Sequence, residues 1–168
     1  MDFFEAVEKR YSHKDAFLPT PIPEEHIDKI VKAGLMAPSG ANRQTVRLVV
    51  LSRQALEGLC EITSYLSLET APCAIAILTE KAEDAKNSFE KEDYAAAMEN
   101  MLLAATALGY ASLWLDSPYF NDQKQLETKK YFGVPTVWHL WAVIPIGLPD
   151  GPSIKRDKLP FESRVKYI

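Results

Sequence analysis

The sequence is poor in cysteine and has no cluster of histidines. Only two cysteines, Cys60 and Cys73, occur in 168 residues, and the three histidines are scattered. Two thiols cannot form a disulfide framework, and neither the cysteines nor the histidines have the spacing of metal ligands. Both cysteines lie in apolar surroundings, where core packing is the expected role. We therefore predict a chain without a metal site in a reducing cytoplasm.

The sequence also lacks a basic excess and a long apolar run. Nineteen Lys and Arg residues stand against 23 Asp and Glu residues, a net charge of −4, whereas nucleic-acid-binding domains are normally basic. The longest apolar stretch, residues 94–110, is interrupted by Glu99 and Asn100 and is shorter than the roughly 20 residues that cross a bilayer. The first ten residues are acidic and amphipathic, unlike a signal peptide. We expect neither a nucleic-acid partner nor a membrane span.

Glycine is scarce as well, with 7 residues. No strand-like segment is followed by a Gly-x-Gly-x-x-Gly turn, and the Walker pattern is missing. The first pattern marks the Rossmann dinucleotide-binding fold and the second marks the P-loop of nucleotide-binding proteins. The sequence therefore predicts neither of these folds.

What is present is the composition of one globular domain, with 47% hydrophobic and 25% charged residues. We predict a single domain over residues 1–168. Hydrophobic periodicity, caps and prolines predict helices at residues 2–10, 23–37, 52–64, 93–108 and 121–133, and strands at residues 46–51, 73–79, 111–115 and 138–146. This order predicts a mixed α/β domain with about four strands. The helix at residues 93–108 is apolar on nearly every face, which predicts a central, buried position.

Three loop segments carry polar residues that a hydrophobic core does not need. The first polar segment, residues 9–14, places Arg10, Ser12 and Lys14 at alternate positions after a helix end. In an extended stretch such side chains point the same way, and a guanidinium, an ammonium and a hydroxyl together suit a phosphate. The same cations are also typical of a helix C-terminus, where they complement the helix dipole. Both interpretations stay open from these residues alone.

The second polar segment, residues 37–44, combines Ser39, Asn42 and Gln44 with small side chains that let a ligand approach the backbone closely. The third polar segment, residues 147–161, follows the last predicted strand. Its cluster of cations is Lys155, Arg156 and Lys158. An ordinary turn and a solvated basic tail are the alternative interpretations of these two segments.

In this order, the segments resemble the nitroreductase family of flavoproteins. The first resembles the Arg-x-Ser-x-Lys/Arg motif of that family, and the second resembles its Ser-Pro-Ser-Ser/Gly-x-Asn-x-Gln motif. Residues 93–114 are similar to its long central helix, and residues 147–149 and 156–162 are similar to its closing segment. The chain departs from the family where Gln44-Thr45-Val46 replaces Gln-Pro-Trp, and where Arg-x-Lys replaces the commoner Lys-x-Arg in the closing segment.

The resemblance implies a mixed sheet of about four to five strands flanked by helices, a long buried central helix, and a homodimer that exchanges its C-terminal segments. FMN would lie at the subunit interface, with Arg10 toward its phosphate and Lys14 toward the pyrimidine side of its ring. The residues implied to bind FMN are Arg10, Tyr11, Ser12, Lys14, Pro38, Ser39, Gly40, Asn42, Arg156 and Lys158. No side chain is implied as acid, base or nucleophile, because the flavin carries the chemistry.

The implied function is that of an FMN-dependent oxidoreductase. It would take electrons from NADH or NADPH and reduce nitroaromatic, quinone or similar electrophilic acceptors by ping-pong hydride transfer. The alternative is a dimer that binds flavin without catalysis, for storage or sensing, which the missing Pro-Trp and the short chain favour. A third interpretation, a relative that remodels flavin or removes halogens, has only the shared scaffold behind it.

Other conspicuous residues are interpreted mainly as parts of the core. Asn100, which is polar in an apolar helix, is expected to bond across a helix contact or to the backbone. His139 is expected to have a structural role on its strand. Six aromatic residues are candidates for a pocket wall, although strand residues more often pack in a core: Tyr65, Trp114, Tyr119, Phe120, Trp138 and Trp141.

Overall fold

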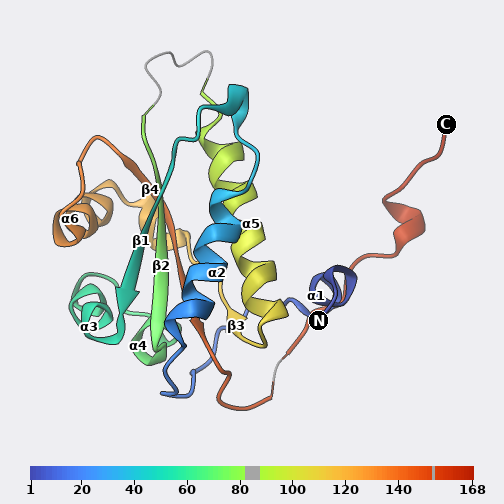
Figure 1. Cartoon of the computed structure of the whole chain (residues 1–168), viewed down its shortest axis with the longest axis horizontal. Coiled ribbons are helices and arrows are strands. Elements are labelled where there is room, and N and C mark those ends of the chain that lie inside the picture. Colours follow the sequence, from blue (N-terminus) through green and yellow to red (C-terminus); the bar gives the residue numbers. More distant parts are fainter. Residues whose placement is uncertain (82–87, 153) are drawn as a thin grey trace.

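A four-stranded sheet runs through the centre of the molecule (Figure 1). The computed structural model describes residues 1–81, 88–152 and 154–168, so Ser153 of the third polar segment lies outside the described residues. The strands are β1 (Val46–Ser52), β2 (Cys73–Thr79), β3 (Ala111–Ser112) and β4 (His139–Gly147), in the spatial order β1-β2-β4-β3. Their number agrees with the prediction.

Every ladder between these strands is antiparallel. Parallel pairing, which the predicted mixed sheet includes, occurs at an isolated bridge between Ser12 and Ser112. The central strand β2 is buried along its whole length, because helices cover both faces of the sheet. Such a strand is an unbroken apolar run in the sequence, which is why its limits agree with the predicted ones.

Helices lie on both faces of this sheet. They are α1 (Phe3–Lys9), α2 (Glu24–Leu35), α3 (Arg53–Ile62), α4 (Leu66–Thr70), α5 (Glu90–Ala107) and α6 (Asp122–Phe132), with the short 3-10 turns η1 (Gly40–Asn42), η3 (Ser117–Phe120) and η4 (Phe161–Ser163). In Figure 1, α3, α4 and α6 lie on one side of the sheet and α2 and α5 on the other. Two apolar clusters result, one around Leu56 and Leu59 and one around Met98 and Met101. No helix in the described residues is long and apolar enough to cross a membrane.

Side-chain caps fix three helix starts at the predicted positions. Asp2, Ser52 and Asn121 accept hydrogen bonds from backbone N–H groups in the first turns of α1, α3 and α6, as N-cap residues do. Gly133 ends α6 in the left-handed conformation, with a φ of 67°, which glycine adopts at little cost. Local capping therefore determines these limits before any tertiary contact is considered.

The long helix α5 packs closely against α2. The side-chain amide of Asn100 donates to the backbone carbonyl oxygen of Ala33 on α2 at 3.1 Å. This bond both crosses a helix contact and ends on the backbone, so the two predicted alternatives are combined in one interaction. Gly34 allows the close approach, because a Cβ there would lie 2.7 Å from Cγ of Met101. The helix begins at Glu90, about one turn earlier than predicted.

His139 on β4 is expected to make the stability of the fold depend on pH. Its ring centroid lies 3.9 Å from that of Trp141, and burial, followed by the charge of Lys129, lowers its pKa below the ordinary value. The folded state then binds fewer protons than the unfolded state, so acid favours unfolding. Stability should fall as the pH drops through about 6.5, and His139→Gln should flatten this dependence in urea titrations at several pH values. An equally steep dependence in the variant would contradict the prediction.

Candidate functional site

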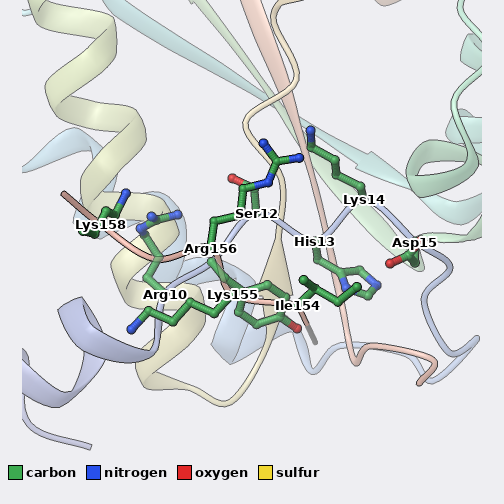
Figure 2. Close-up of a pocket in the computed structure, with 10 residues that line it drawn as sticks. Arg10, Ser12, His13, Lys14, Asp15, Ile154, Lys155, Arg156 and Lys158 are labelled. Carbon is green, nitrogen blue, oxygen red and sulfur yellow. The ribbon is translucent and has the colours of Figure 1, made fainter. Parts of the chain in front are cut away.

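The first and third polar segments meet at one cavity of about 400 Å³ (Figure 2). It lies where the chain leaves α1 and where residues 154–158 pass the same point. The residues that line it are Arg10, Tyr11, Ser12, His13, Lys14, Asp15, Ile154, Lys155, Arg156 and Lys158. We call it the basic cavity. Cations from opposite ends of the sequence thus lie together within a single chain.

Backbone pairing holds the first polar segment extended beside the sheet. Ser12 forms its parallel bridge with Ser112, and the N–H of His13 donates to the carbonyl oxygen of Ser112 at 2.9 Å. The His13 side chain is buried, with Nε2 at 2.9 Å from the carbonyl oxygen of Ala16. Because side chains alternate along an extended backbone, the buried His13 leaves Ser12 and Lys14 exposed. The extended backbone therefore explains why the predicted binding residues Ser12 and Lys14 are two positions apart in the sequence.

The basic cavity carries a strong excess of positive charge. Five Lys or Arg side chains line it, against the single carboxylate of Asp15. Arg10 also has an acidic neighbour on α5, because its Nε lies 3.6 Å from Oε1 of Glu99. This contact uses Nε and does not occupy the two terminal nitrogens of the guanidinium. Like charges this close repel one another, so a bound anion with several oxygens would stabilise the arrangement.

The second polar segment lies away from the basic cavity. Pro38 and Ser39 line a separate cavity of about 170 Å³ next to α2 and α5. Gly40 and Asn42 form the turn η1 beside it. Among the described residues, those predicted to bind one ligand divide into two sets within one chain. The basic cavity contains Arg10, Tyr11, Ser12, Lys14, Arg156 and Lys158, and the second set is Pro38, Ser39, Gly40 and Asn42.

The turn in the second polar segment is strained. Ala41, Asn42 and Gln44 have φ values of 52°, 54° and 52°. This left-handed conformation costs roughly 1–2 kcal/mol for a residue such as Ala41 or Gln44, whereas asparagine adopts it more readily. Gly40 is required for a different reason, because a Cβ there would lie 2.3 Å from the ring of Phe89. Strained backbone of this kind is concentrated at ligand-binding sites, where the surrounding structure maintains it.

The candidate aromatic residues lie elsewhere. Trp114 and Trp141 flank Tyr94 of α5, at ring-centroid distances of 5.9 and 4.5 Å. Tyr119 is buried, whereas Phe120 is 74% exposed. None of the six candidates is among the described residues that line the basic cavity. In the same described part of the chain, no group of three His, Cys, Asp or Glu residues is arranged to hold a metal ion.

Four residues that line the basic cavity are not among those implied to bind FMN: His13, Asp15, Ile154 and Lys155, of which only Lys155 was noted, as a member of the cation cluster. His13 and Asp15 alternate with predicted residues, and Ile154 and Lys155 directly precede Arg156. Proximity in sequence is the signal that identifies them. Lys155 also donates its Nζ to the carbonyl oxygen of Glu8 near the end of α1, which joins the two basic segments directly.

The sequence matches a known protein family. The sequence profile of the Nitroreductase family matches the chain over residues 7–67 and 64–148. The chain belongs to the nitroreductase family. This membership confirms the predicted family and the predicted enzyme class, an oxidoreductase.

Relatives of this nitroreductase-family protein cover nearly its whole length. "Putative NADH dehydrogenase/NAD(P)H nitroreductase" from Methanothermobacter thermautotrophicus is 30% identical over 159 residues, which are 94% of this chain and 82% of the relative. A crystal structure of the same name from Bacteroides thetaiotaomicron has 27% identity and a TM-score of 0.81, covering 98% of this chain and 95% of that one.

A third relative has a flavin in its crystal structure. The nitroreductase with bound FMN from Bacteroides fragilis is 23% identical, with a TM-score of 0.81, over 100% of this chain and 99% of that chain. At this identity the likeness concerns the fold. The predicted nitroreductase-like fold is therefore confirmed for this nitroreductase-family chain.

Proposed function

We propose that the protein is an FMN-dependent oxidoreductase that uses NADH or NADPH to reduce nitroaromatic, quinone or similar electrophilic acceptors by a ping-pong mechanism. The observation that carries the proposal is the basic cavity, where Arg10, Ser12 and Lys14 meet Arg156 and Lys158. The bound FMN of the Bacteroides fragilis structure and the name of the Methanothermobacter thermautotrophicus relative support the choice of cofactor and electron donor.

The residues of the basic cavity fit the phosphate end of FMN. A phosphomonoester carries about −1.5 to −2 charges at neutral pH, and Arg10, Arg156 and Lys158 supply the opposite charge. Each charge-assisted hydrogen bond contributes roughly 1.5–3 kcal/mol, so three of them provide much of the ~8 kcal/mol that micromolar affinity requires. The cavity volume of about 400 Å³ is within the usual size of ligand pockets.

The protein contributes binding and electrostatics to the reaction. When bound, FMN supplies the hydride-accepting and hydride-donating chemistry. Arg10 and the cations of residues 154–158 anchor the phosphate, and Ser12 adds a small hydroxyl donor. Lys14, which the family pattern assigns to the pyrimidine side of the ring, provides positive charge that favours the electron-rich form. No side chain in this scheme acts as acid, base or nucleophile.

We propose further that the enzyme is a homodimer whose C-terminal segments are exchanged. One chain exposes 10056 Å², whereas a compact monomer of 18.9 kDa exposes about 8,300 Å². All described residues after Gly151 are exposed, Leu159 and Phe161 among them. In Figure 1 this segment extends away from the sheet and α5, past α1. A second chain would cover these apolar side chains.

A dimer also explains why the predicted FMN residues fall into two sets. In this arrangement each flavin lies at the interface, between the basic cavity of one subunit and the second polar segment of its partner. Phe3 and Phe4, which are 64% and 76% exposed, add apolar surface on α1, the helix that precedes the basic cavity in the chain. Exposed apolar surface of this extent is typical of an interaction site.

The decisive experiment is spectroscopic. The purified protein should show flavin absorbance, or acquire it with FMN at one equivalent per chain, and FMN should raise its melting temperature. Anaerobic stopped-flow mixing with NADH and with NADPH should then bleach the flavin rapidly, and a quinone or nitroaromatic compound should restore the absorbance. A flavin that binds but is not reduced would identify a passive flavin-binding dimer. A protein that binds no FMN would refute the proposal.

A further inference from the structure

Asp93 holds both ends of the strained turn in the second polar segment. One carboxylate oxygen, Oδ1, accepts a hydrogen bond from the backbone N–H of Gly40 at 2.7 Å. The other, Oδ2, accepts from the hydroxyl of Thr45 at 3.0 Å. Asp93 lies in the first turns of α5, whose residues Ala97, Met98 and Met101 are buried in the core. The carboxylate of Asp93 therefore connects Gly40 and Thr45, the residues on either side of the turn.

The surroundings of Asp93 make these two bonds important. Its side chain is buried, at 3% exposure, and the described residues show no ion pair with it, so the two donors satisfy its carboxylate. A buried carboxylate that lost them would be left poorly solvated. The turn in between adopts left-handed backbone at Ala41, Asn42 and Gln44, a conformation that needs external support to persist. The carboxylate and the turn therefore stabilise each other.

Local bonds complete the turn and orient its polar side chains. The N–H of Gln44 donates to Oγ of Ser39 at 3.0 Å, and Nε2 of Gln44 donates to Oδ1 of Asn42 at 3.3 Å. The hydroxyl hydrogen of Ser39 and the amide N–H groups of Asn42 are donors that these two bonds do not use. In the described part of the chain, the side-chain hydrogen bonds of Asp93 go to Gly40 and Thr45 and not to Ser39 or Asn42. Asp93 acts on both through the backbone at Gly40.

We propose that Asp93 and Thr45 are positioning residues that hold the second polar segment ready for the flavin. This inference rests on the proposed function, because the segment is assigned to the flavin by that proposal. Thr45 is the partner of Asp93 that departs from the usual family pattern. The family pattern has proline there, which has no hydroxyl, whereas here the hydroxyl of Thr45 occupies one oxygen of the buried carboxylate. Preorganisation of this kind improves affinity by lowering the cost of ordering the loop.

Thr45 offers a matched pair of variants for the test. Thr45→Val keeps the shape of the side chain and removes the hydroxyl, whereas Thr45→Ser keeps the hydroxyl. We expect the Kd for FMN to rise about tenfold in Thr45→Val, the loss of one hydrogen bond to a charged group, and to stay within about twofold in Thr45→Ser. Fluorescence titration of the full-length protein with FMN measures both. Equal Kd values in the two variants would overturn the inference.

A second readout separates this inference from the proposed function. In the flavin-free protein, hydrogen exchange of the Gly40 amide should become at least about tenfold faster in Thr45→Val than in Thr45→Ser, since the loosened carboxylate no longer protects that N–H. Wild-type protein that binds no FMN would refute the proposed function and with it the assignment of the segment to flavin. Wild-type protein that binds FMN, together with an equally slow Gly40 amide in both variants, would refute the positioning role alone.

Discussion

Replacing Arg10 by alanine is expected to weaken FMN binding by roughly 1.5–3 kcal/mol, the contribution of a hydrogen bond to a charged group. This corresponds to a Kd about 10- to 150-fold larger. Arg10 lines the basic cavity, and its contact with Glu99 is made through Nε. The terminal nitrogens therefore form a fixed fork of the shape that suits two phosphate oxygens. Titration with FMN, followed by flavin fluorescence, measures the change.

Lys9→Ala is the matched control for that experiment. Lys9 is the neighbouring cation, so its loss changes the net charge equally. It pairs with Glu5 on α1 at 2.6 Å and is not among the residues that line the basic cavity. We expect its Kd for FMN to stay within about twofold of wild type, as surface charge effects are small. If Arg10→Ala bound FMN as wild type does, the phosphate would have to lie elsewhere.

A single acidic substitution in the C-terminal segment should dissociate the proposed dimer. Leu159 is 71% exposed in one chain, and exchange of the segment would bury it against the partner. Leu159→Asp would place a charge in that contact, at a cost of about 3 kcal/mol or more. We therefore expect a monomer at micromolar concentrations, together with loss of FMN, because each site would lose the residues that the partner supplies. Light scattering after size-exclusion chromatography gives the mass directly.

Val137→Asp tests whether any new surface charge has the same effect. Val137 is also 71% exposed, and it lies in the segment between α6 and β4. In Figure 1, α6 and α1 lie on opposite sides of the sheet. This variant should remain dimeric and bind FMN. Two dimeric variants, or two monomeric ones, would contradict the proposed exchange. Far-UV circular dichroism should be unchanged in both variants, since neither side chain belongs to the core.

Much of the fold could be predicted from local signals. Asp2, Ser52 and Asn121 are caps whose side chains act on the next few residues, so no tertiary information is needed to recognise them. The strand Cys73–Thr79 is equally plain, since burial on both faces produces a continuous apolar run. Elements of this kind leave a recognisable pattern in their own residues, so the sequence alone reveals them.

Elements determined by tertiary pairing were predicted less well. The helix Leu66–Thr70 was not predicted, because a helix of five residues is too short to show a helical period. The strand predicted at residues 111–115 pairs regularly only at Ala111 and Ser112, and Leu115 returns to the sheet as an isolated bridge with Val143. The residue at which such a segment leaves the sheet depends on its partner strand. The sequence of the segment itself does not identify that partner.

The candidate site shows the same division. Arg10, Ser12 and Lys14 can be recognised as a candidate site from the sequence, because they place three anion-binding groups at alternate positions. Asp93 cannot be recognised in this way, since an acidic residue in the first turn of a helix is explained by the helix dipole alone. Its bonds to Gly40 and Thr45 span 53 and 48 residues of sequence, and only the fold brings these groups together.

The helix α5 contacts both sets of candidate residues within one chain. Asp93 near its start holds the strained turn, and Glu99 farther along lies beside Arg10. In a dimer that shares its flavins, those two contacts belong to different cofactors. A small rotation of α5 would change the contacts at both flavins. Binding or reduction of FMN at one site would in this way affect the other site through this helix.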